Sequence, residues 1–346
     1  MRIDLTLAMT AAIVALQGAV TSKEIVSPAL PPNAVKAIHV RRCETNPLID
    51  SKTSGSLGDN INGPSVIRVP KWIKDPLGKY YMYFANHGGK YIRLAYADTL
   101  QGPWKIYEPG TLHLDQAKAF TGHIASPDVH VDEDKKEIRM YFHGHARDRK
   151  RQYSGVALSK DGLTFHASDE ILGKFYFRVF RWKGYYYAIA KDWKSGWGEL
   201  YRSKDGLTPF ESRGNFVRMM RHCAILVSNN RLLIFYSRKG DAPERIVVAT
   251  VALTGDWMSW KESDSIDVIH PEKEYEGVVF PNEPSQYGSA TKVRQLRDPC
   301  IFEEDGKIYL FYTVAGEMGI AMSELDISMK SDAEPEPERD GLKPGR

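Results

Sequence analysis

Residues 297–312 read Arg297-Asp-Pro-Cys-Ile-Phe-Glu-Glu-Asp-Gly-Lys-Ile-Tyr-Leu-Phe-Tyr312, and Gly319-Ile-Ala-Met322 follows after a short interval. An apolar segment, an Asp-Gly turn, a segment rich in Tyr and Phe, and another apolar segment stand in this order. Aromatic and β-branched residues favour strands, and Asp-Gly readily adopts the backbone of a two-residue hairpin turn. The stretch therefore predicts three antiparallel strands joined by tight turns.

The same unit occurs five times between Ser65 and Glu324. Its central, aromatic strand is expected at Lys79–Ala85, Ile138–His143, Tyr185–Ala190, Leu232–Tyr236 and Lys307–Tyr312. Two copies continue with similar segments, Ser159-Lys-Asp-Gly-Leu-Thr-Phe165 and Ser203-Lys-Asp-Gly-Leu-Thr-Pro-Phe210, which predict a hairpin into a fourth, outer strand. Repeated four-stranded sheets are typical of a propeller. We therefore predict an all-β fold, a five-bladed β-propeller with four-stranded antiparallel blades, over a β-sandwich, which would not repeat one unit in register.

The propeller is predicted to span residues 61–326, with different segments on either side. Residues 1–22 combine Arg2, an apolar run and small residues before Ser22, which is typical of an export signal peptide; a short hydrophobic helix is the alternative. Residues 23–60 are expected to form an N-terminal extension that packs on the propeller or supplies a closing outer strand. Residues 327–346 include Glu334-Pro-Glu-Pro-Glu-Arg339 and are predicted to be a disordered tail.

The composition excludes several classes of protein. Of the 346 residues, 42% are hydrophobic and 26% are charged, so the chain is neither disordered nor collagen-like. The net charge of +3 comes from 47 basic and 44 acidic residues spread along the chain, which argues against nucleic acid as a partner. No segment reaches the run of about 20 apolar residues that spans a membrane. The three scattered cysteines form no disulfide framework or metal motif. We expect a secreted or periplasmic protein, and no segment specifies an oligomeric state.

Polar residues at the ends of strands are predicted to form the functional site. In a propeller the first strand of each blade lines the central channel and starts at the face where the second strand ends, so these residues converge on one funnel. At the first-strand starts they are Asn62, Asp128, Arg178, Arg221, His222 and Asp298, and after the second strands they include His87, His143, Lys191 and Glu317. Directional polar groups beside flat rings such as Trp193 or Trp197 suit a carbohydrate.

Two strand starts, Ser126-Pro-Asp-Val129 and Arg297–Tyr312, resemble the five-bladed β-propeller glycoside hydrolases of family 43 and the related families 32 and 117. Gly78–Ala85 with Ile92–Trp104 is similar to their first blade, and the resemblance covers about residues 60–325. It implies a secreted glycoside hydrolase that acts on a poly- or oligosaccharide in the central funnel. The alternative is a propeller that binds glycans without cleaving them. Protein interaction is a third class, disfavoured by so charged a funnel.

The catalytic residues of family 43 do not transfer directly. Its members usually have an Asp base, an Asp that tunes a pKa and a Glu acid at the starts of blades one, three and four. This chain has Asn62-Gly63-Pro64, Phe177-Arg178 and Arg221-His222 at those places. Family 117 resembles the chain in having a His in place of the Glu acid, which implies His222 as the general acid.

We therefore predict His222 as the acid and Asp298 or Asp128 as the base, with Glu283 of Pro281-Asn-Glu-Pro284 as a substitute acid. The predicted substrate-binding residues are Asn62, His87, His143, Arg178, Arg221 and Glu283. The cationic groups Arg178, Arg221, Arg238 and Lys191 favour an anionic sugar, since guanidinium groups match carboxylate and sulfate geometry. His87, His143 and His145 have an alternative role as metal ligands. No cofactor is predicted, and a structural metal ion in the central channel is left open.

Overall fold

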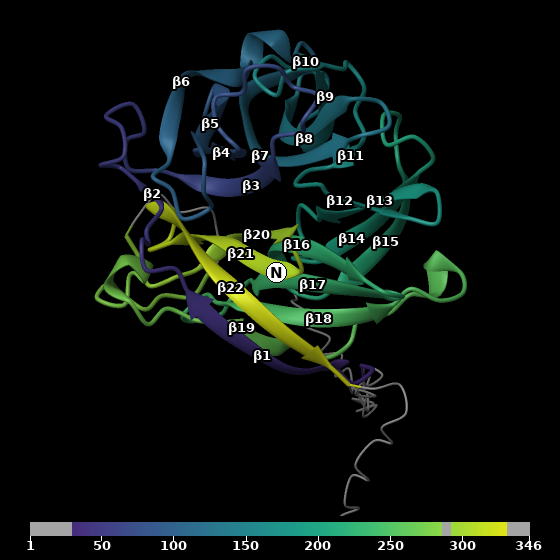
Figure 1. Cartoon of the computed structure of the whole chain (residues 1–346). Helices are drawn as coiled ribbons and strands as arrows, with labels where there is room; N and C mark the ends of the chain where they lie inside the picture. The colour runs from purple at the N-terminus through teal and green to yellow at the C-terminus, as the bar shows by residue number, and fades with distance from the viewer. Residues whose placement is uncertain (1–29, 286–291, 331–346) are drawn as a thin grey trace, which may run out of the picture.

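The structure, a computed structural model, describes residues 30–285 and 292–330. Five antiparallel sheets are arranged around one axis, with the first strand of each sheet innermost (Figure 1). Each sheet contains a buried central strand rich in aromatic residues. Rings of neighbouring blades meet edge to face, as Tyr83 and Phe165 do with centroids 5.7 Å apart. Contacts of this kind join each blade to the next, and the buried residues of the described chain form five apolar clusters, each between two neighbouring blades.

The strands follow the predicted order along the chain. Blade one contains β3 (Asn62–Arg68), β4 (Tyr80–Ala85), β5 (Tyr91–Ala97) and β6 (Lys105–His113). Blade two contains β7 (Phe120–Asp132), β8 (Glu137–Ala146), β9 (Gln152–Ser159), β10 (His166–Ala167) and β11 (Gly173–Lys174). Blade three contains β12 (Arg178–Trp182), β13 (Tyr185–Lys191), β14 (Gly198–Ser203) and β15 (Glu211–Val217). Blade four contains β16 (Met220–Ser228), β17 (Arg231–Arg238), β18 (Ile246–Ala252) and β19 (Ile266–Ile269). Blade five contains β20 (Arg297–Glu304), β21 (Lys307–Val314), β22 (Gly319–Met329), β1 (Val35–Arg42) and β2 (Ile49–Asp50).

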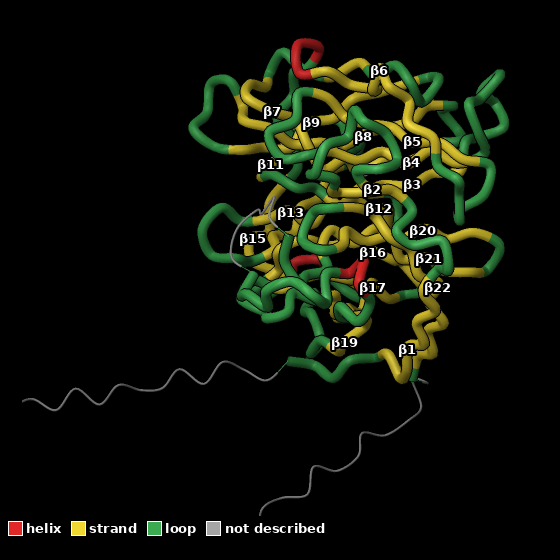
Figure 2. Tube along the Cα trace, turned by 90° about the vertical axis from the view of Figure 1, so that its left-hand side faces the viewer, coloured by secondary structure: helices red, strands yellow, loops and turns green. Residues whose placement is uncertain are grey.

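The predicted all-β, five-bladed propeller is confirmed. β3 packs beside β7 and β20, and β16 packs beside β12 and β20, so the last blade adjoins the first. Blade two divides its outer position between β10 and β11, which both pair with β9. Within the described part of the chain, helix is confined to the short turns η1 (Leu114–Gln116), η2 (Trp257–Ser259) and η3 (Glu274–Glu276), red in Figure 2. None of the helices described is long and apolar enough to cross a membrane.

The repeated Ser-Lys-Asp-Gly segment forms the same turn in blades two and three. Asp161 and Asp205 each accept backbone hydrogen bonds from the residues two and three positions later. Gly162 and Gly206 have φ values of 75° and 72°. Glycine is required at Gly206, because a Cβ there would also lie 2.7 Å from the hydroxyl of Tyr141. The turn leads to β10 in blade two and to β15 in blade three, which is the predicted hairpin into an outer strand.

Blade five is built from both ends of the described chain. β1 pairs antiparallel with β22, with Ile38 opposite Ile327, and the two strands lie side by side in Figures 1 and 2. β22 ends at Met329, past the predicted boundary at 326, because Ile327 and Met329 pack on the core between blades four and five. Part of the 23–60 segment thus supplies an outer strand. The predicted export signal and the predicted tail from 331 onward lie outside the described residues.

Candidate active site

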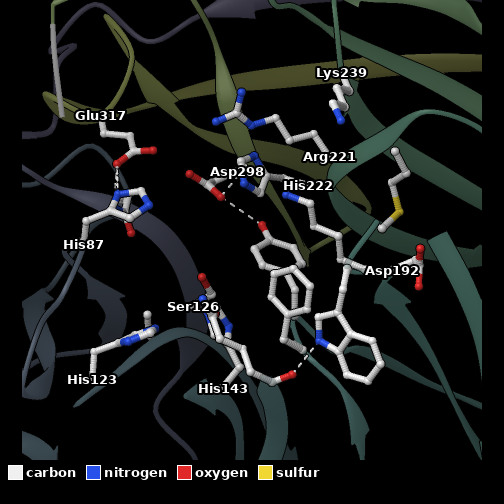
Figure 3. A pocket seen from close by; sticks show the side chains of 18 of the residues that line it. His87, His123, Ser126, His143, Asp192, Arg221, His222, Lys239, Asp298 and Glu317 are labelled. Carbon is white, nitrogen blue, oxygen red and sulfur yellow. Dashed lines mark hydrogen bonds and ion pairs between the residues drawn. The ribbon is translucent and has the colours of Figure 1, made fainter. Parts of the chain in front are cut away.

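A pocket of about 360 Å³ lies at one mouth of the propeller axis, and all five blades contribute to it (Figure 3). Its ionisable lining residues are His87, His123, His143, His222, Asp192, Asp298, Glu317, Lys191, Lys194, Lys239, Arg221 and Tyr176. Trp193 lies on the wall and Trp197 does not. A second cavity, of about 600 Å³, is lined by the first strands alone and shares no lining residue with the pocket. This second cavity is the central channel.

Three residues on the pocket floor have left-handed backbone conformations. Ser126, Tyr176 and Asp298 have φ values of 50°, 67° and 44°. The ladder between the first and second strands shifts register around Ser126 and Asp298, as at a β-bulge. Such conformations cost non-glycine residues on the order of 1–3 kcal/mol each and are concentrated at functional sites. The bulges place Ser126 and Asp298 in the pocket lining, and Tyr176 joins them from just before β12.

Asp298 is the carboxylate of the floor. Its Oδ1 accepts a hydrogen bond from the Tyr176 hydroxyl at 2.9 Å, and its Oδ2 accepts one from the Thr313 hydroxyl at 3.3 Å. Nδ1 of His222 lies 3.5 Å from the same Oδ1. Burial, followed by the negative charge of Glu317, raises the pKa of Asp298 above its ordinary value. Asp298 can therefore exchange a proton closer to neutral pH than an exposed aspartate can.

Glu317 and His87 form a second pair, on the wall beside the floor (Figure 3). Oε2 of Glu317 accepts hydrogen bonds from Asn60 at 2.9 Å, from Asn62 at 3.1 Å and from Nδ1 of His87, and its Oε1 accepts one from Arg297 at 2.9 Å. Burial opposes ionisation, but these contacts hold the pKa of Glu317 at about 2. The bond to Glu317 raises the pKa of His87, whose side chain is 53% exposed. An imidazole oriented by a carboxylate is suited to carry a proton.

The other imidazoles of the pocket are neutral at pH 7. Burial, with the charges of Lys191 and Arg221, holds the pKa of His222 well below its usual range, and burial does the same for His143. Burial also lowers the pKa of His123 to about 4. Within residues 30–285 and 292–330, no three His, Cys, Asp or Glu side chains are placed to hold a metal ion, so His87, His143 and His145 do not form a three-ligand metal site.

The pocket brings together several of the predicted site residues, namely Asn62, His87, His143, Arg221, His222 and Asp298. Asp128 is a correction, because it lies in the channel. There it accepts hydrogen bonds from His130 at 2.9 Å and from the backbone of Val179 at 2.7 Å. The reason is the strand register: Asp298 precedes a proline, whereas Asp128 follows one, so the counterpart of Asp298 in blade two is Ser126.

Arg178 and Glu283 are also placed differently from the prediction. Arg178 lies beneath Tyr176, with its guanidinium carbon 4.2 Å from the ring centroid, and lines the channel. It occupies the register position of Asp128, and Tyr176 takes the pocket position two residues earlier. Glu283 is an exposed residue of the loop before blade five, and its backbone carbonyl is anchored by Gln295 at 2.8 Å.

Some residues of the site carried no assigned role in the sequence analysis. Ser126 could have been found by aligning the Ser-Pro and Asp-Pro pairs of blades two and five. Tyr176, unlike Ser126 and Asp298, does not precede a proline, so its place in the pocket is visible only from the strand register of the structure. Glu317 was placed at the funnel without a role, and the contacts that define its role come from Asn60, Asn62 and His87 of other segments.

The fold and pocket define the class: a five-bladed β-propeller with a polar pocket at its axis. Solved structures with this fold include a GH43 β-xylosidase/α-arabinofuranosidase from a compost microbial metagenome in complex with xylotriose (TM-score 0.56, 15% identity, 84% of this chain and 95% of that chain). A GH43 enzyme from Xanthomonas citri has a TM-score of 0.55 at 13% identity over 81% of this chain and 90% of that chain. A third structure comes from the GH130 family of mannoside phosphorylases, which contains glycoside hydrolases that target β-1,2-mannosidic linkages in Candida mannan. It has a TM-score of 0.57 at 11% identity and covers 83% of this chain and 93% of that chain. The likeness confirms the fold that the family resemblance implied.

Sequence comparison identifies a nearer relative. No protein-family profile matches the chain. It is 37% identical over 327 residues to the uncharacterized protein R118 of Acanthamoeba polyphaga mimivirus, covering 83% of this chain and 90% of that protein. The chain belongs to the same family as this mimivirus protein.

Proposed function

We propose that the protein is a secreted glycoside hydrolase that cleaves a poly- or oligosaccharide in the axial pocket. The observation that carries this proposal is the presence of two separate proton-transfer groups in one polar pocket, Asp298 on the floor and the His87–Glu317 pair on the wall. Glycosidic hydrolysis needs one group to protonate the leaving oxygen and one to activate water. Proteins of known structure with this fold include a β-xylosidase/α-arabinofuranosidase and a member of a family of mannoside phosphorylases and hydrolases, and this supports a carbohydrate substrate.

In this proposal His87 is the general acid and Asp298 the general base. The predicted acid, His222, is a poorer choice, because its low pKa leaves it without the proton that it would have to give. Its side chain is also only 12% exposed, against 53% for His87. His222 instead lies beside Asp298, which is oriented by its hydrogen bonds from Tyr176 and Thr313. Asp128, the other predicted base, lies in the channel.

The proposal also holds that the sugar bound in the pocket carries a negative charge. Of the cations expected to favour an anionic sugar, Lys191 and Arg221 line the pocket. Arg178 lies beneath Tyr176, and Arg238 pairs with Asp241 at 3.1 Å. Cleavage of matched neutral and acidic oligosaccharides tests whether the sugar carries the charge, and a preference for neutral substrates would remove this part of the proposal.

Export is proposed on the sequence of residues 1–22. Expression of the full chain in a secreting host should yield extracellular protein whose N-terminus lies near Ser22. An intact N-terminus on protein retained in the cell would contradict export without affecting the proposed chemistry.

Purified protein should release reducing ends from at least one member of a panel of plant, algal and microbial glycans. Asp298→Asn and His87→Gln should each reduce kcat by roughly 10²–10⁴-fold, the usual range for a general acid or base, while glycan binding persists. His166→Gln, an exposed residue of blade two, is the matched control and should leave kcat unchanged. Glycan binding without turnover by the unmodified protein would favour the non-catalytic propeller.

A further inference from the structure

The turn between β8 and β9 of blade two is strongly basic. Residues 147–151 read Arg147-Asp-Arg-Lys-Arg151, and all of them are exposed. The turn lies on the pocket face of the propeller, because His143 near the end of β8 and Gln152 at the start of β9 both line the pocket. This segment, called the basic turn below, therefore stands at the rim of the pocket.

Two aromatic rings join the basic turn to the pocket wall. The guanidinium carbon of Arg149 lies 4.7 Å from the ring centroid of Tyr153, and that of Arg151 lies 5.3 Å from the ring centroid of Trp193, which follows β13 of the neighbouring blade (Figure 1). The two rings meet edge to face with centroids 5.0 Å apart, and the Trp193 indole donates to the carbonyl of Gln152 at 2.8 Å. Because Trp193 and Gln152 line the pocket, the arginines continue its wall outward.

Aromatic rings, and not carboxylates, hold these arginines. Within the described part of the chain, Arg149, Lys150 and Arg151 form no ion pair with a carboxylate. Asp192 of the neighbouring hairpin accepts instead from Lys174, at 2.6 Å. A guanidinium that lies over a ring keeps its in-plane N–H groups for a ligand, whereas in an ion pair these groups are occupied. The arginines are thus ordered in advance and remain able to bind carboxylate or sulfate groups.

The position of the basic turn favours an acidic polysaccharide as the ligand. Its charges lie outside the pocket, so they can contact only a ligand that extends beyond the sugar bound inside. A long glycan chain with acidic groups along its length meets this condition. Nucleic acid is disfavoured, because it needs a wide basic surface and the whole chain carries a net charge of only +3.

We infer that the basic turn binds the carboxylate or sulfate groups of an acidic polysaccharide whose chain runs from the axial pocket past Trp193 and Tyr153. The inference rests on the proposed glycan cleavage and deepens it, because it makes the substrate a polymer that is recognised away from the bond that is cleaved. Asp298 and His87 keep their proposed roles. The basic turn contacts the substrate equally before and during the reaction, so its charge should affect KM and leave kcat unchanged.

Polymer binding tests the site without turnover. The full chain is titrated calorimetrically with polygalacturonate and with dextran sulfate, which distinguish carboxylate from sulfate recognition, and with neutral dextran. At least one acidic polymer should bind, and more weakly in about 500 mM than in about 50 mM sodium chloride. Arg149→Gln/Arg151→Gln should weaken this binding by about tenfold or more, since charge-assisted hydrogen bonds are lost. Both positions are exposed, so the variant should fold.

The matched control removes two other exposed cations that lie over aromatic rings. Arg181 lies 5.2 Å from the Tyr186 ring and Lys183 lies 5.7 Å from the Trp182 ring, at the hairpin between β12 and β13 that is at the opposite end of blade three from the pocket. Arg181→Gln/Lys183→Gln should bind the acidic polymer as the unmodified protein does. Failure of both acidic polymers to bind, equal losses in the two double variants, or tighter binding of single-stranded DNA than of either polymer overturns the inference.

Turnover separates the basic turn from the pocket. For an acidic glycan that the unmodified protein cleaves, KM is measured with the polymer and with a short oligosaccharide made from it. Arg149→Gln/Arg151→Gln should raise KM for the polymer only. An unchanged KM for the polymer, or cleavage confined to neutral glycans, overturns the inference and leaves the proposed hydrolysis standing. Polymer binding that depends on the basic turn, with no cleavage of any glycan, supports the binding site and contradicts the hydrolysis.

Discussion

Tyr176 of blade three donates its hydroxyl to Oδ1 of Asp298 of blade five at 2.9 Å, across the pocket floor. Both residues have left-handed backbones, and Arg178 stacks beneath the tyrosine ring. The hydrogen bond stabilises the ionised form of Asp298, against the burial and the Glu317 charge that favour the neutral form. The proton affinity of Asp298 is thus set jointly by blades three and five.

Removing the Tyr176 hydroxyl should move one limb of the pH profile. In the proposed mechanism activity falls on the acid side as Asp298 is protonated, and on the alkaline side as His87 loses its proton. Tyr176→Phe removes a donor to the ionised carboxylate, so the acid limb should move to higher pH by about one unit, given that bonds to charged groups contribute about 1.5–3 kcal/mol. The alkaline limb should stay in place. Tyr185→Phe, at the far end of blade three, is the control, and equal movement of both limbs would contradict the assignment.

Removing the charge of Glu317 should move both limbs to lower pH. After burial, the Glu317 charge is the main cause that raises the pKa of Asp298, and its hydrogen bond is the main cause that raises that of His87. Glu317→Gln should lower both pKa values. In this variant the buried Arg297 keeps its hydrogen bond to Glu244 at 2.8 Å, so the protein should still fold. NMR titration of His87 provides a readout that does not need substrate. An unchanged His87 titration, alongside an unchanged Glu170→Gln control, would remove Glu317 from this role.

Closure of the ring should depend on one buried ion pair between the N-terminal strand and the loop before blade five. Arg42 of β1 donates from Nε to Glu276 at 2.7 Å, and Glu276 also accepts from the Tyr312 hydroxyl at 3.0 Å. Glu276 is fully buried, so Arg42→Ala would leave its charge unpaired and should destabilise the fold by about 3–5 kcal/mol. Arg41→Ala breaks a pair in which the arginine side chain is 71% exposed and should cost less than about 1 kcal/mol. Urea unfolding measures the free energy of unfolding of both variants. Similar decreases for the two would contradict this account of ring closure.

The fold was predictable because one strand–turn–aromatic-strand unit recurs, and recurrence constrains topology more strongly than any single strand does. For the site, the sequence predicted which end of each blade carries the pocket, but not which side chains point into it. Side chains alternate along a strand, and a left-handed residue such as Ser126 or Tyr176 changes that alternation without a distinctive composition, which is why Asp128 was misplaced. The preference for His222 over His87 had a different cause, since burial and neighbouring charge decide which imidazole holds a proton, and neither is visible in a linear pattern.

Glu262 should make the stability of the propeller depend on pH. Its side chain is 4% exposed, and its two carboxylate oxygens accept from the backbone NH of Arg218 at 3.0 and 3.2 Å. Burial raises the pKa of Glu262 to about 7 from 4.5, although Arg218 partly opposes the shift. Between these values the folded chain binds a proton that the unfolded chain does not, so stability is highest at low pH and falls as pH rises toward 7.

Glutamine at position 262 keeps an acceptor oxygen and carries no charge. Glu262→Gln should therefore be more stable than the unmodified protein at pH 8, by about 3 kcal/mol from the linkage relation, and by less than about 1 kcal/mol at pH 5. Urea unfolding at the two pH values measures the difference. Glu211→Gln, whose side chain is 63% exposed, is the control and should show the same small effect at both pH values. A Glu262→Gln effect that does not change between pH 5 and pH 8 would mean that the carboxylate is already ionised in the fold, held by Arg218.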